Sequence, residues 1–175
     1  RPVRSLVGLP TLPTLEHISL LRTRLTSTAA LAQQAALRSI AISYIRPSLF
    51  AALAPLSHLE QLHLDLRYQS GAVKLEPLAA IRDLVVDHAA QVMRLNGLEK
   101  WRALERLMLD KLVPGAFPYG IAALPQLREL TLKDCPEVDL GRMRGMALER
   151  LRLLGLTTPR GLTEFEATHP ETEVL

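Results

Sequence analysis

The sequence predicts an α/β solenoid, in which short parallel strands line a concave face and helices or irregular turns cover the convex face. Three observations indicate this fold. The apolar spacing L-x-x-L-x-L, with Ile or Val at some places, recurs seven times along 175 residues. The copies begin 21 to 23 residues apart, which is enough chain for a strand, a turn and a short return segment. Aromatic residues make up 4% of the chain and hydrophobic residues 48%, a composition typical of many similar leucine layers.

Each copy of the spacing predicts one strand. Its fourth and sixth residues are apolar while the residue between them varies, and this alternation is typical of a strand with one buried face. The expected strands lie near 15–20, 37–42, 59–64, 81–86, 104–109, 127–132 and 148–153.

The segments between the strands carry helix signals. Ser27 and Thr28 are suited to cap a helix in STAALAQQAA, and Pro47 is suited to the first turn of one in RPSLFAALAPL. An apolar residue stands three places before most copies, with Gln34 and Gly145 as the exceptions. A strand and a return segment in about 22 residues predict one coil of a solenoid.

The repeat resembles the leucine-rich repeat family, whose pattern is L-x-x-L-x-L-x-x-N/C-x-L. The resemblance covers residues 12–157 and implies a horseshoe. The ninth position departs from the family, because only Cys135 conforms to it. We therefore expect irregular turns, a fold held mainly by leucine packing, and an unreactive Cys135 packed in a turn. The other ninth residues are Thr23, Ile45, Arg67, Ala89, Leu112 and Leu156.

We expect one domain over 1–175 that belongs to a larger protein with flanking domains, because neither end shows the polar cap that a solenoid needs. A single cysteine cannot form an internal disulfide and favours a cytoplasmic location. No apolar run approaches the roughly 20 residues of a membrane span. The formal charge of +3 is spread among both signs, and no aromatic residues interleave with the arginines near the C-terminus. Neither a membrane nor a nucleic acid is therefore the expected partner.

The repeat also predicts which side chains face a partner. The third, fifth, seventh and eighth residues of each unit project from the concave face, since the first, fourth and sixth are buried. Strands lie about 4.8 Å apart, so Asp65, Asp87 and Asp110 would stack as like charges in the seventh column. A cation or a basic partner would relieve this repulsion; alternatively the carboxylates are solvated, with Lys111 and Lys133 nearby. The candidate partner-binding residues are Tyr44, Gln61, His63, Asp65, Asp83, Asp87, His88, Arg106, Asp110, Lys111, Glu129, Lys133, Asp134, Arg150 and Arg152.

Two histidines beside this column raise the question of a metal site. His63, Asp65, Asp87 and His88 would lie on adjacent strands, and such ligands suit zinc or manganese. The two histidines stand in different columns, however, and nothing in the sequence fixes a closed coordination geometry. We therefore expect ordinary surface histidines, no metal and no cofactor. A metal-dependent enzyme built on His63 and Asp87 is the alternative from another class.

The sequence contains no catalytic motif and predicts a protein that is not an enzyme. We expect a recognition module that binds a protein partner through its concave face. Units such as LPQLRELTLKDC (124–135) also resemble the C-terminal repeats of bacterial NACHT-type, NLR-like signalling ATPases, which implies the sensor region of such an ATPase. The alternative is a substrate-recruiting or scaffolding module of a multidomain bacterial effector or enzyme.

Overall fold

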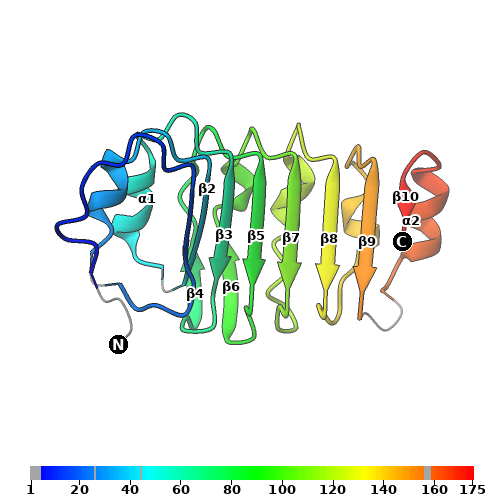
Figure 1. Cartoon of the computed structure of the whole chain (residues 1–175). Helices are drawn as coiled ribbons and strands as arrows, with labels where there is room; N and C mark the ends of the chain where they lie inside the picture. The colour runs from blue at the N-terminus through cyan, green and yellow to red at the C-terminus, as the bar shows by residue number, and fades with distance from the viewer. Residues whose placement is uncertain (1–4, 26, 44, 156–158) are drawn as a thin grey trace.

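Eight short strands form one parallel sheet in a computed structural model, which describes residues 5–25, 27–43, 45–155 and 159–175. The strand order is β1-β2-β3-β5-β7-β8-β9-β10, so neighbours in the sheet also follow one another along the chain (Figure 1). The protein therefore has an α/β fold with a parallel sheet. The strands are β1 (His17–Leu20), β2 (Ser39–Ser43), β3 (Gln61–Asp65), β5 (Asp83–Asp87), β7 (Arg106–Asp110), β8 (Glu129–Lys133), β9 (Arg150–Leu154) and β10 (Glu173–Val174).

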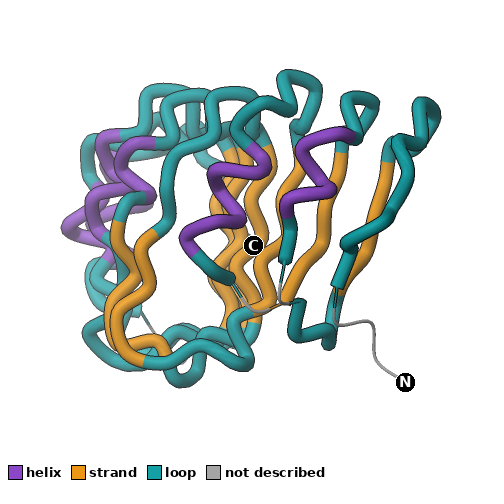
Figure 2. Tube along the Cα trace, turned by 90° about the vertical axis from the view of Figure 1, so that its left-hand side faces the viewer, coloured by secondary structure: helices purple, strands orange, loops and turns teal. Residues whose placement is uncertain are grey.

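The connecting segments lie on one side of this sheet and leave its other face open (Figure 2). Pro47 occupies the first turn of α1, as predicted, whereas the segment after Ser27 and Thr28 forms a 3-10 helix without a side-chain cap. No helix in the described ranges has the length and apolar character needed to cross a bilayer. The connecting elements are α1 (Pro47–Leu53), α2 (Leu162–Thr168), the 3-10 helices η1 (Ala29–Gln33), η2 (Leu98–Lys100), η3 (Tyr119–Ala123) and η4 (Leu140–Met143), and a two-stranded sheet of β4 (Gly71–Lys74) and β6 (Val92–Asn96).

The seven long strands begin two residues after the predicted starts, because the first leucine of a unit closes a tight turn before the strand. The backbone N–H of Leu104, for example, donates to the carbonyl of Trp101 over 3.0 Å. Strand pairing then places equal positions of neighbouring units side by side, as it does for Leu62 and Leu84. Residues at the same position of successive units therefore form columns across the sheet.

Leucine layers fill the space between the sheet and the connecting segments. The inward residues of the central strands are nearly inaccessible, with Leu62 at 2%, Leu84 at 1% and Leu107 at 2% exposure. Trp101, at the end of η2, belongs to the same hydrophobic core and is 1% exposed. Burial of each leucine side chain contributes about 1.5–3 kcal/mol, so the repeated layer is the main source of stability.

Gln34 interrupts the apolar layer and ties down the N-terminal segment. Its side chain is fully buried. The amide oxygen accepts a hydrogen bond from the backbone N–H of Leu12 over 2.9 Å, and the amide nitrogen donates to the carbonyl of Pro10 over 3.0 Å. A polar residue therefore replaces an apolar one here because the adjoining backbone needs both a donor and an acceptor.

A shared backbone conformation ends most of the strands. The eighth residue of five units is left-handed, with φ of 59° at Arg22, 54° at His88, 56° at Lys111, 49° at Asp134 and 65° at Gly155. The ninth side chain then turns into the core, as the full or nearly full burial of Ala89, Leu112 and Cys135 shows. These turns are more regular than the sequence predicts. Five different residue types occupy the eighth position, yet all five have nearly the same φ value.

Candidate functional site

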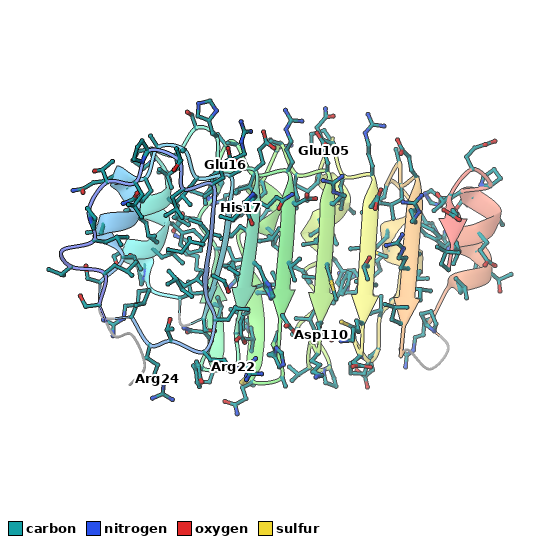
Figure 3. All side chains as sticks on the ribbon, in the orientation of Figure 1. Glu16, His17, Arg22, Arg24, Glu105 and Asp110 are labelled. Atoms are coloured by element: carbon teal, nitrogen blue, oxygen red, sulfur yellow. The ribbon has the colours of Figure 1, made fainter. Side chains whose placement is uncertain are left out.

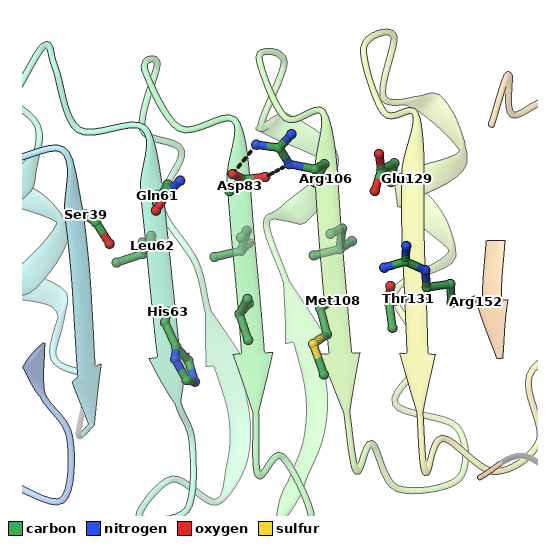
Figure 4. Close-up of a pocket in the computed structure, with 13 residues that line it drawn as sticks. Ser39, Gln61, Leu62, His63, Asp83, Arg106, Met108, Glu129, Thr131 and Arg152 are labelled. Carbon is green, nitrogen blue, oxygen red and sulfur yellow. Dashed lines mark hydrogen bonds and ion pairs between the residues drawn. The ribbon is translucent and has the colours of Figure 1, made fainter. Parts of the chain in front are cut away.

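A shallow hollow of about 320 Å³ lies on the open face of the sheet and crosses its central strands (Figure 4). It combines apolar and polar side chains from the third and fifth positions of several units. Six of the predicted partner-binding residues line it: Gln61, His63, Asp83, Arg106, Glu129 and Arg152.

Charged side chains of the third column pair with one another across the sheet. Arg106 donates two hydrogen bonds to Asp83, and these hydrogen bonds raise the pKa of Arg106 above its usual value. Arg150 donates to Glu129 over 3.0 Å and to Glu173 over 2.8 Å. Four predicted site residues therefore stabilise the strand register, with a modest contribution because the pairs are exposed.

A second charged row lies at the start of the strands and was missed by the sequence prediction. It occupies the second position of each unit, where acidic and basic residues alternate from one unit to the next (Figure 3 labels Glu16 and Glu105). The ion pairs join Arg38 to both neighbours, Glu16 and Glu60, at 3.9 Å. Alternating signs at one position of the repeat are the signal that would have predicted this row. The full row is Glu16, Arg38, Glu60, Arg82, Glu105, Arg128 and Glu149.

The side chains that remain free lie in the third and fifth columns. Among the described residues, neither Gln61 nor Arg152 makes a side-chain hydrogen bond or ion pair, although both reach the hollow (Figure 4). Met108 and Thr131 contribute fifth-column side chains to the same hollow. This mixed, unpaired surface is the part of the open face that the fold does not use for its own stability.

The prediction that the seventh column is exposed is wrong for two of its three aspartates. Asp65 and Asp110 are each 1% exposed, while the Asp87 side chain is 23% exposed. These residues end their strands, and the turn that follows covers them. Lysine substitutions at Asp65 or Asp110 would therefore place a charge in the interior and disrupt the fold.

Asp65 is satisfied within the fold. The Ser43 hydroxyl donates to it over 2.7 Å, and Arg67 donates from its backbone N–H over 3.1 Å and from Nε over 2.7 Å. The backbone N–H of Arg22 in turn donates to the Ser43 hydroxyl over 2.8 Å. Asp65 is thus the centre of a hydrogen-bond network that connects the ends of three coils, and it does not face a partner.

Asp110 is in a different situation from Asp65, because no N–H or hydroxyl group of the described chain donates a hydrogen bond to its carboxylate oxygens and its neighbour is a second carboxyl group, that of Asp87. Burial raises its pKa, and the neighbouring Asp87 raises it further. Burial also raises the pKa of Asp87, but a hydrogen bond with the Asp110 carboxyl group and the charge of His88 lower it by more, so the pKa of Asp87 lies below its usual value. The pair therefore combines a carboxyl group that favours a proton with one that stays ionised.

The four residues weighed as metal ligands come together only in part. His63 Nε2 lies 3.5 Å from Asp87, and His88 Nδ1 lies 2.8 Å from the same carboxylate. Asp65 is 3.6 Å from His88, but its oxygens are already bonded elsewhere. The compact set of possible ligands in the described chain is instead Asp87, His88 and Asp110. Both histidines are partly buried, which differs from the expected ordinary surface histidines.

The remaining predicted residues lie at the ends of the strands. Lys111 and Asp134 occupy the left-handed turns rather than the strands. Lys133 ends β8, and its Nζ lies 3.6 Å from Asp110. Tyr44 lies outside the described residues.

Cys135 is fully buried, and its thiol lies 3.4 Å from the carbonyl of Leu109 and 3.2 Å from that of Lys133. Burial raises the pKa of the thiol. A buried thiol with a raised pKa is a poor nucleophile, which agrees with a packing role. The contact with Leu109 also links the turn after β8 to the neighbouring strand β7.

No protein-family model matches the chain, and no curated protein is similar to it. Its function is therefore inferred from the geometry described above.

Proposed function

We propose that the chain is a leucine-rich-repeat solenoid whose concave face recognises another protein. The interval of 21 to 23 residues, the parallel strands in chain order and the buried first, fourth and sixth positions support the leucine-rich repeat assignment. The hollow on the open face of the sheet supports its concavity.

The observation that carries the recognition function is the contrast between paired and unpaired side chains on this face. Asp83, Arg106, Glu129 and Arg150 are engaged with one another or with Glu173. The hollow that Asp83, Arg106 and Glu129 help to line is also lined by Gln61, Met108, Thr131 and Arg152, whose side chains make no hydrogen bond or ion pair among the described residues. An apolar floor with an unpaired guanidinium at its rim suits an aliphatic or aromatic anchor next to a carboxylate.

In this proposal the chain performs no catalysis and acts in the cytoplasm. Its context is the sensor region of an NLR-like ATPase, where ligand capture by the repeats releases an attached nucleotide-binding domain. The alternative is the recruitment of substrates to an enzyme domain in the same polypeptide. The full reading frame distinguishes the two, because a nucleotide-binding loop upstream favours the sensor and a catalytic domain downstream favours recruitment.

Two substitutions in the hollow test the recognition function. Thr131→Trp fills the hollow, and Arg152→Glu reverses its unpaired charge. We expect proximity labelling in the source cells to identify partners with the parent chain that both variants lose, with the thermal unfolding midpoint unchanged. Lys100→Glu, an exposed charge change on the helical side, is the matched control and should keep every partner. Retention of the same partners by the double variant would refute the proposed face.

A further inference from the structure

Three ligand-type side chains converge where β5 and β7 end. One ligand atom from each of Asp87, His88 and Asp110 lies within 4.8 Å of the other two. Asp87 is the last residue of β5, His88 follows it in the turn, and Asp110 is the last residue of β7, which pairs with β5. The cluster is therefore built by strand pairing at one edge of the sheet, near the strand ends where Figure 3 labels Asp110.

The burial of Asp110 is a second, independent observation. Its side chain is 1% exposed, and no N–H or hydroxyl group among the described residues donates a hydrogen bond to either oxygen. The nearest cation, Lys133 Nζ, is 3.6 Å away, beyond hydrogen-bond distance. His88 Nδ1 is also buried and makes no hydrogen bond, although it lies 2.8 Å from Asp87. Buried acceptors without a donor are costly and rare in folded proteins, so the cluster calls for a ligand that accepts their lone pairs.

We propose that Asp87, His88 and Asp110 bind one divalent transition-metal ion, with zinc as the preferred metal. An imidazole nitrogen and two carboxylates form a ligand set that suits zinc better than calcium or magnesium. Zinc also binds such nitrogen and oxygen ligands more tightly than manganese does. The metal neutralises the two adjacent carboxylates and gives the unpartnered oxygens of Asp110 a positive charge to coordinate.

The distances allow such an ion after a small adjustment. Bonds of about 2.0–2.2 Å hold the ligand atoms of tetrahedral zinc roughly 3.4 Å apart, and the three ligand atoms here lie within 4.8 Å of one another, so a movement of at most about 1.4 Å brings each pair to that separation. His63 Nε2 lies 3.5 Å from Asp87 and borders the site, but the compact set of ligands consists of Asp87, His88 and Asp110. Asp65 is excluded because Ser43 and Arg67 occupy its oxygens.

Calorimetric titration of the full chain with zinc chloride at neutral pH, after removal of metals with a chelator, tests the site. We expect one zinc ion per chain and weaker binding of manganese and calcium. Asp110→Asn and His88→Gln should each weaken zinc binding by at least about tenfold, since even outer-shell changes have effects of that size. Asp134→Asn removes an exposed carboxylate from the next turn and should leave the affinity unchanged. Lys133→Met removes the nearest competing cation and should tighten binding by roughly tenfold.

The nitrogen resonances of the histidine rings give a readout that needs no variant. Zinc should shift Nδ1 of His88 in the parent chain, while His17, His58 and His169 keep their values. The absence of saturable zinc binding would overturn the proposal, as would equal affinity in well-folded Asp110→Asn and His88→Gln. Unchanged His88 resonances at saturating zinc would also overturn it. In each of these cases a shared proton alone would account for the Asp87–Asp110 pair.

Discussion

Replacement of Asp65 by alanine tests the conclusion that the seventh column serves the fold. The substitution removes an acceptor that is 1% exposed and receives three hydrogen bonds, from the Ser43 hydroxyl and from two groups of Arg67. Ser43 is fully buried, so its hydroxyl loses its acceptor, at a cost of about 1–3 kcal/mol. The Arg67 side chain is 28% exposed and recovers part of its loss in water. We therefore expect unfolding to become easier by about 2–4 kcal/mol.

Urea unfolding followed by circular dichroism measures this change, with an unchanged slope as the sign of an intact native state. Asp65→Asn keeps the shape but loses the charge, so it should cost less than alanine. Asp134→Asn is the matched control, because the same substitution at an exposed turn residue should change stability by less than about 0.5 kcal/mol. A loss below about 1 kcal/mol for Asp65→Ala would show that the buried network does not stabilise the strand ends.

Three further substitutions address the turns, the thiol and the charged rows. Lys111→Gly should stabilise the protein by up to about 1 kcal/mol in the same urea assay, because Lys111 has φ of 56° and glycine adopts this conformation without steric cost. Because burial raises the pKa of Cys135, its thiol should react with a thiol reagent at least about tenfold more slowly in the native than in the unfolded chain. Cys135→Ala should lower the stability of the protein without loss of partner binding. Arg106→Ala should cost less than about 1 kcal/mol, and the loss should shrink in high salt, because its pairing with Asp83 is exposed.

The repeat predicts the strands and their columns well because both depend on apolar spacing. Strand pairing sets equal positions side by side, so the spacing alone identifies Leu62 and Leu84 as neighbours. The two-residue delay of the strand starts was not predictable from that spacing. The delay arises because the first leucine of each unit is buried in the turn before the strand. The sequence does not show this, since a buried position calls for an apolar residue in a turn as well as in a strand.

Burial of the seventh column was not predicted because it depends on the turn that follows each strand. Lys111 after Asp110 is left-handed, whereas Leu66 after Asp65 is not, so neither a residue type nor one backbone conformation marks the turns that cover Asp65 and Asp110. The pairing of the third column was also missed, although the stacking that puts Asp65, Asp87 and Asp110 in one column also sets Arg106 beside Asp83.

The division of the polar residues among stability, the proposed metal binding and the proposed recognition follows from the geometry of one repeat. Second- and third-position charges pair along the sheet, and the seventh position closes the strand ends, which leaves the fifth position free to vary. His63 is the exception, because it lines the hollow and also lies 3.5 Å from Asp87 at the proposed metal site. A metal ion bound there would fix Asp87, which lies beside the His63 ring at the edge of the recognition surface. The two proposed sites are therefore separable by mutation at Asp110 and Arg152, yet they lie side by side at His63, so a bound metal would influence the partner.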